Sequence, residues 1–133
     1  MAETEPYESK KTDLKGSSTV LLVADLKQTT DYYARLGFVE EAIGGHTHMH
    51  RGNVTFILHP AANPTDVRPN SVAEGGLYFD VFCYPDSIKM VYEEFADAGA
   101  DIVNGPHWDK FWSEFTIRDL NGYRIAFGGG LDE

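Results

Sequence analysis

Three histidines at alternate positions are the most direct candidates for chemistry in this chain. His46, His48 and His50 stand just before an Arg-Gly-Asn turn signal. Alternate side chains of a β-strand point to the same face, so this spacing brings three imidazoles together. Three imidazoles can hold a zinc, iron or manganese ion, usually with a further ligand from another strand, and His59 is the only candidate nearby. The alternative is an ordinary histidine-rich strand face without a metal.

The elements that would position these residues follow a pattern that occurs twice. Each half predicts an apolar strand, a helix with one apolar side that stops at a glycine (Gly37 or Gly99), a second strand and a hairpin. The hairpin turns contain Gly52 and Gly122. The predicted organisation is a frayed or partner-docked arm over residues 1–16 and one domain over residues 17–130, which consists of module 1 (17–59), a proline-rich linker (60–75) and module 2 (76–130).

The composition limits the partners that the chain can bind. Its 133 residues, 42% of them hydrophobic, suffice for one domain with a core. Twenty-one acidic against eleven basic residues give a net charge of −10, which disfavours nucleic acid and anionic membranes and favours cationic small molecules. The single cysteine, Cys83, has apolar neighbours, which predicts a buried thiol in a reducing compartment. Because the sequence contains no apolar signal segment or bilayer-spanning window, we expect a cytoplasmic protein.

Two segments resemble the signatures of a known superfamily. The first half contains "VADLKQTTDYYARLGF" and the second contains "FTIRDLNGYRIAF". These look like the V-x-D-L…F-Y…L-G-F and R-D-P-x-G-N-x-x-x-F patterns of the vicinal oxygen chelate superfamily of glyoxalases, extradiol dioxygenases and bleomycin-resistance proteins. Leu120 replaces the usual proline and Tyr123 the usual asparagine. The resemblance covers residues 18–128 and implies an α+β fold, in which two tandem βαβββ modules form a curved mixed sheet around a cleft and the helices lie outside.

The resemblance also implies where a metal would bind. In metal-dependent members, the ligands are a histidine early in the first strand of each module and a carboxylate or histidine in its last strand. The matching positions here are Ser18, Phe56, Gly76 and Ala126, none of which is suited to hold a divalent ion. We therefore expect no metal and no cofactor. The histidines of the 46–50 strand are expected to lie opposite Met49 and away from the cleft.

A cleft without a metal suggests binding rather than chemistry. The segment "GPHWDKFWSEF" concentrates aromatic residues near the expected cleft mouth, where they suit flat ring systems, although Trp112 and Phe115 fit a core position equally well. Alternation along residues 76–81 places Tyr78 and Asp80 in the cleft, where the carboxylate would favour a cation or would pair with Arg124. The predicted ligand-binding residues are Met49, Phe56, Tyr78, Asp80, Trp108, Phe111, Trp112 and Arg124.

Vacant metal positions, aromatic residues and negative charge together favour the metal-free bleomycin-resistance branch of the superfamily. The predicted function is binding and sequestration of an aromatic, cationic compound, as in antibiotic resistance, by a homodimer with clefts between modules of two chains. The alternative is a glyoxalase-like or dioxygenase-like enzyme, which would use a divalent metal at the histidines or Asp80 or His107 as a general base. A third interpretation is a sensor or structural module that keeps the fold without a ligand.

Overall fold

The computed structural model describes residues 12–131, and the predicted two-module α+β fold is confirmed. The first module consists of β1 (Thr19–Val23), α1 (Leu26–Arg35), β2 (Val39–Ile43), β3 (His46–Arg51) and β4 (Val54–Pro60). The second consists of β5 (Val81–Cys83), α2 (Ile88–Asp97), β6 (Asp101–His107), β7 (Ser113–Arg118) and β8 (Arg124–Gly129). Most of the predicted 1–16 arm lies outside the described residues.

Each module forms a four-stranded mixed sheet. The strand orders are β1-β4-β3-β2 and β5-β8-β7-β6, with the first pair of each sheet parallel and the others antiparallel. The linker contains two short 3₁₀ turns, η1 (Pro64–Asp66) and η2 (Asn70–Val72). No helix in the 12–131 region is long and apolar enough to cross a membrane.

Each helix begins after a capping side chain and ends at the predicted glycine. Asp25 caps α1 by accepting a hydrogen bond from the Gln28 backbone, and Ser87 caps α2 by accepting one from the Met90 backbone. A glycine with positive φ follows each helix, at Gly37 (φ 88°) and Gly99 (φ 83°), as the αL helix stop requires. Both halves therefore use the same local signals to turn the chain back toward its sheet.

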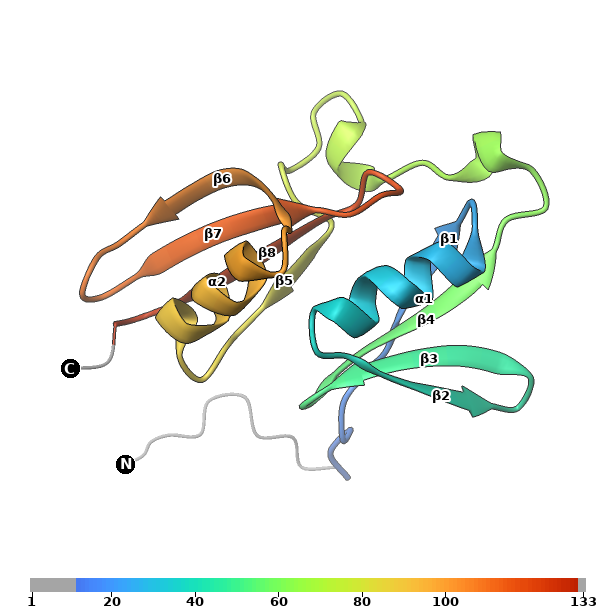
Figure 1. The fold of residues 1–133 in the computed structure, drawn as a ribbon, viewed down its shortest axis with the longest axis horizontal. Coiled ribbons are helices and arrows are strands. Elements are labelled where there is room, and N and C mark those ends of the chain that lie inside the picture. Colours follow the sequence, from blue (N-terminus) through green and yellow to red (C-terminus); the bar gives the residue numbers. More distant parts are fainter. Residues whose placement is uncertain (1–11, 132–133) are drawn as a thin grey trace.

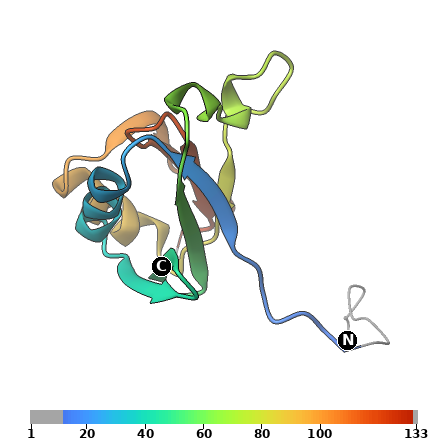
Figure 2. The same cartoon turned by 90° about the vertical axis from the view of Figure 1, so that its right-hand side faces the viewer.

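Both helices lie on the same side of the molecule, each over one face of the sheet in its own module (Figure 1). The view from the side shows that neither helix covers the opposite face of the strands (Figure 2). We call this opposite side the open face. Strand alternation assigns every second side chain of each sheet to the core under the helices and the rest to the open face.

The two modules share one core. Tyr33 in α1 donates a hydrogen bond to Asp119 Oδ2 at 2.6 Å, and Tyr123 donates one to the Leu22 carbonyl at 2.8 Å. Arg51 of β3 donates to Glu94 of α2 at 2.6 Å and also lies 5.4 Å from the centre of the Phe95 ring. These contacts cross from one module to the other, so the modules pack as one body rather than as separate units.

The core also contains two residues that were predicted to line the ligand site. Met49 and Phe56 face each other across β3 and β4 and are only 0% and 1% exposed. The Phe56 ring contacts the Tyr33 ring edge to face at 5.4 Å, beneath α1. The prediction that Met49 and Phe56 line the cleft is therefore wrong. Their apolar side chains face the helix, where their burial stabilises the fold.

Candidate functional site: an aromatic and polar sheet face

The open face of the second sheet carries a mixed set of side chains. Strand register aligns Phe82 with Ala126, Ala126 with Thr116, and Thr116 with Asn104 across the four strands. The next aligned row contains Gly128, Glu114 and His107. This face therefore combines small residues on β8 with an acid, a hydroxyl and an imidazole on neighbouring strands.

Aromatic rings gather at the β5 edge of this face. Tyr78 contacts Phe79 with ring centroids 5.1 Å apart, and Phe79 contacts Phe82 at 5.2 Å. Phe82 stacks on Trp112 with centroids 5.9 Å apart and planes inclined by 19°. Tyr78 and Trp112 were predicted for this site, and their side chains remain 41% and 47% exposed, so the rings are accessible to a ligand. We call Tyr78, Phe79, Phe82 and Trp112 the aromatic cluster.

Gly128 makes the stacking of Phe82 and Trp112 possible. A Cβ atom at this position would lie 2.5 Å from Trp112 Cζ2 and 2.6 Å from Phe82 Cζ, well inside van der Waals contact. The missing side chain lets both rings lie directly against β8, which is one of the positional uses of glycine in a strand. The glycine therefore supports the aromatic cluster without contacting solvent itself.

Glu114 joins two members of the aromatic cluster. Its carboxylate accepts a hydrogen bond from Trp112 Nε1 at 3.1 Å and another from the Tyr78 hydroxyl. Both donors are neutral, so they orient the carboxylate without cancelling its charge. The arrangement offers a flat ring a stacking surface and offers a cation a fixed negative partner.

Two polar atoms on the same face lack partners within the described residues. Thr116 Oγ1 and Arg124 Nε are both buried, and neither forms a hydrogen bond. An unpaired buried donor is costly, so such groups in native proteins require an explanation such as a ligand or water. Thr116 and Arg124 lie on adjacent strands, one row apart in register, and both atoms are closed to solvent, so neither is an accessible ligand contact.

Asp80, predicted as the anionic contact for a cation, is held in a different role. Its carboxylate accepts hydrogen bonds from the Ser71 backbone at 2.7 Å, the Ser71 hydroxyl at 2.6 Å and the Arg124 backbone at 2.8 Å. It pairs with Arg124 through the backbone N–H and not through the guanidinium. Asp80 thus fastens the linker to β8, and these three donors fill most of its capacity to accept.

The remaining predicted aromatics lie away from the cluster. Trp108 contacts Tyr92 of α2 edge to face at 5.6 Å and lies 6.0 Å from Lys89 Nζ, which places it on the helix side. Phe111 is 82% exposed at the tip of the β6–β7 loop, with Lys110 over its ring. Trp108 comes directly after the last residue of β6, so its contacts with α2, and not strand alternation, determine its place.

The histidine strand occupies the open face of the first sheet. His48 and His50 have ring centroids 5.9 Å apart, and His46 lies 6.4 Å from His59. His50 contacts Thr55 Oγ1 at 2.8 Å and Glu41 Oε1 at 2.9 Å. The prediction that the histidines lie opposite Met49 is confirmed, but their direction away from the cleft is corrected, since the helix covers the Met49 face.

Neither sequence-predicted enzyme site is assembled as a complete constellation. Within residues 12–131, no group of three or more His, Cys, Asp or Glu side chains is arranged to hold a metal ion. His107, the predicted general base, is exposed and contacts only Asn104 Oδ1, at 3.3 Å, among the described hydrogen bonds. Burial raises the pKa of the Cys83 thiol to about 11, so this cysteine is a poor nucleophile near neutral pH, as its apolar surroundings predicted.

Phe82, Glu114 and Gly128 were missed by sequence reasoning, although one signal was available. The segment "SEFTIR" alternates strictly, which would have placed Glu114 and Thr116 on the face opposite the buried Phe115 and Ile117. The predicted alternation along residues 76–81 stops before Phe82, and β5 begins only at Val81. The stacking role of Gly128 leaves no local sequence signal, because it depends on rings from two other segments.

Comparison with known proteins agrees with this architecture. No protein-family model and no curated protein matches the sequence. Among solved structures, an integron cassette protein from the mobile metagenome of V. cholerae is 23% identical with a TM-score of 0.67, and the match covers 89% of this chain and 96% of that one. A glyoxalase family protein from Bacillus cereus is 15% identical with a TM-score of 0.65, covering 94% and 100%.

A glyoxalase/bleomycin resistance protein from Streptomyces sp. CB03234 is 17% identical with a TM-score of 0.61, and the match covers 84% of this chain and 98% of that chain. At these identities the likeness concerns the fold. The chain has the two-module fold of glyoxalase/bleomycin resistance proteins, spanning almost the full length of each of these three structures.

Proposed function

We propose that the protein binds a flat, cationic aromatic compound on the open face of the second sheet and sequesters it without converting it. The single observation that carries this proposal is the Phe82–Trp112 stack, which lies beside the Glu114 carboxylate. Stacking and area burial would hold the ring system, and Glu114 would select a positive charge. Resistance to a toxic compound by sequestration is the biological role that fits such binding.

The charge distribution supports a cationic ligand. The net charge of −10 raises the concentration of cations near the surface, and Glu114 is the acid that lies against the aromatic cluster. Glu114 replaces Asp80 in this role, because the Asp80 carboxylate is engaged by three donors of the chain itself.

We further propose that two copies form a homodimer through their open faces. Val20, Val39 and Ile43 on the open face of the first sheet are 61%, 67% and 43% exposed. Exposed aliphatic side chains on one face favour a protein partner, and a second copy would close the aromatic face of the other chain into a cleft. Light scattering of a Val20→Glu variant should show a monomer where the unmodified chain shows a dimer; a monomeric unmodified chain would contradict this.

Binding is tested with a matched pair of probes, N-methylacridinium and the neutral parent acridine. Both should quench tryptophan fluorescence, and the cation should bind more tightly. Glu114→Gln should weaken the cation by about 1–2 kcal/mol, close to tenfold in Kd, with little effect on acridine. Trp112→Ala should weaken both ligands, since stacking does not depend on ligand charge. Calorimetry provides a second readout that is free of optical overlap.

Glu93→Gln is the matched control, because Glu93 is exposed on α2, away from the open face. It removes the same charge from the chain and should leave both affinities unchanged. Equal losses in the Glu114→Gln and Glu93→Gln variants would mean that only the general charge matters. Absence of saturable binding, or turnover of a bound compound, would overturn the sequestration proposal and favour the enzyme alternative.

A further inference from the structure

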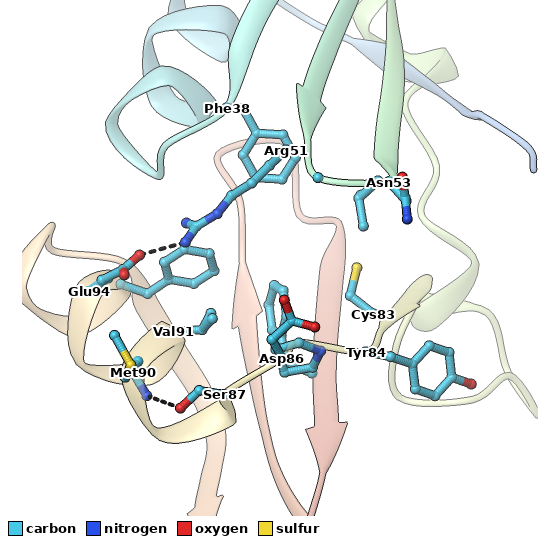
Figure 3. A pocket seen from close by; sticks show the side chains of 15 residues that line it. Phe38, Arg51, Asn53, Cys83, Tyr84, Asp86, Ser87, Met90, Val91 and Glu94 are labelled. Atoms are coloured by element: carbon cyan, nitrogen blue, oxygen red, sulfur yellow. Dashed lines mark hydrogen bonds and ion pairs between the residues drawn. The ribbon is translucent and has the colours of Figure 1, made fainter. Parts of the chain in front are cut away.

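A hollow lies on the other side of β5, between the two modules (Figure 3). It has a volume of about 450 Å³, which lies in the range of small-molecule sites. The β3–β4 turn forms one wall, and the loop that leads from β5 into α2 forms the opposite wall. We call it the intermodule pocket.

The floor of the intermodule pocket is apolar. Phe38 and Val54 line it from the first module, and Cys83, Val91 and Phe95 line it from the second. Cys83 and Phe82 are neighbours on β5 and therefore point to opposite faces of the strand. Cys83 faces the intermodule pocket, whereas Phe82 belongs to the aromatic cluster, so the two sites are separate.

The charged groups of the pocket do not cancel. Arg51 donates to the Leu36 carbonyl at 2.6 Å and forms an ion pair with Glu94 at 2.6 Å. Asp86 is the remaining charged residue of the lining, and the ion pairs among residues 12–131 do not include it. Figure 3 shows the Asp86 side chain directed into the hollow, between Cys83 and Ser87. One solvent-exposed negative charge thus borders the apolar floor.

From this combination we infer that the intermodule pocket binds a small amphipathic amine, with the ammonium group at Asp86 and the hydrocarbon part against Val91 and Phe95. A primary ammonium has three donors and would satisfy the Asp86 carboxylate, while the apolar floor gains from burial of the hydrocarbon. An anionic ligand would meet the Asp86 charge, because Arg51 and Glu94 offset each other, and is therefore disfavoured.

The only cysteine of the chain supplies a direct test. Modification of Cys83 by methyl methanethiolsulfonate, followed by intact-mass measurement at fixed pH, reports access to the pocket floor. Phenethylamine is the probe, with phenethyl alcohol and phenylacetate as neutral and anionic analogues of similar shape. At about ten times its Kd, the amine should slow modification about tenfold, since the free fraction falls by that factor. The two analogues should protect much less.

Asp86→Asn keeps the shape of the side chain and should abolish the advantage of the amine over the alcohol. Asp97→Asn, which removes an exposed charge at the other end of α2, should leave protection unchanged. Trp112→Ala should also leave it unchanged, which separates this site from the proposed function. Equal protection by all three probes, or unaltered selectivity in Asp86→Asn, would overturn the amine assignment. Absence of protection by any probe would overturn the site itself.

Discussion

Tyr33 of α1 donates a hydrogen bond to Asp119 at 2.6 Å, although 86 residues separate them in the sequence. The other carboxylate oxygen accepts from the backbone of Asn121 and Tyr123 at 2.8 and 2.9 Å. Burial raises the pKa of Asp119, and its hydrogen bonds from Tyr33, Asn121 and Tyr123 oppose that rise. The Asp119 carboxylate therefore stabilises the turn before β8 and also links this turn to α1 of the first module.

The Tyr33→Phe variant should lose about 1–3 kcal/mol of unfolding free energy at pH 7, because the buried carboxylate loses a donor. Loss of that donor also raises the pKa of Asp119 further. In the folded variant, Asp119 therefore becomes protonated at a higher pH than in the unmodified protein. The loss of unfolding free energy caused by Tyr33→Phe should then become smaller as the pH falls through that pKa. Urea unfolding at pH 7 and pH 4 measures both values. Tyr84→Phe, at an exposed tyrosine, should change neither; a pH-independent deficit for Tyr33→Phe would contradict this explanation.

The Gly128→Ala variant should displace Phe82 and Trp112, because its methyl group would lie within 2.6 Å of both rings. We expect a stability loss of about 1–3 kcal/mol from overpacking and a shift of tryptophan emission. Gly16→Ala is the control, since a Cβ at Gly16 has nothing within 4 Å. Unchanged emission and stability in Gly128→Ala would contradict the close packing of Phe82 and Trp112 against Gly128.

The Asp80→Ala variant should loosen the linker, because the Ser71 backbone, the Ser71 hydroxyl and the Arg124 backbone lose their acceptor. We expect a loss of about 2 kcal/mol or more and faster proteolysis within residues 60–75. Asp66→Ala, also in the linker and exposed, is the matched control. A stable Asp80→Ala variant with weakened cation binding would return Asp80 to the role of ligand contact.

Metal content tests the histidine face of the first sheet. Protein purified without a histidine tag should contain clearly less than one equivalent of zinc, iron, manganese or nickel, and a chelator should not change its melting temperature. The reason is that, among residues 12–131, the histidines and the acids near them do not form a group of three or more side chains arranged to hold a metal ion. Elemental analysis provides the measurement. One tightly bound ion per chain that is lost in a His48→Gln variant would show that the histidines form a metal site.

The sequence predicts the fold well because the signals for it are local. The helix stops at Gly37 and Gly99 and the hairpin turns at Gly52 and Gly122 each depend on a few neighbouring residues, and they occur in the same order in both halves. Alternation likewise determines which side chains share a face. It grouped the histidines of β3 correctly opposite Met49.

The candidate site was predicted less well because it depends on contacts between distant segments. The predicted alternation along residues 76–81 lies almost entirely before β5, which begins at Val81, so the face predicted for Asp80 does not follow from strand geometry. Nothing in the local sequence shows that Asp80 accepts from Ser71, or that Trp112 reaches Phe82 over Gly128. Helix packing likewise determines which face of a strand is buried, and it cannot be read from the strand sequence alone. In this fold α1 covers the face that carries Met49 and Phe56.

The short strand β5 has a consequence for regulation. Phe82 and Cys83 are consecutive residues on opposite faces of a three-residue strand. A displacement of the strand backbone therefore moves a side chain of the aromatic cluster and a side chain of the intermodule pocket together. If an amine in the intermodule pocket moves this strand, the affinity of the aromatic cluster for its ligand must change. Thermodynamic linkage then requires the reciprocal effect by the same factor. Titrating acridinium with and without saturating phenethylamine measures that factor, and a value of one would mean that the two faces act independently.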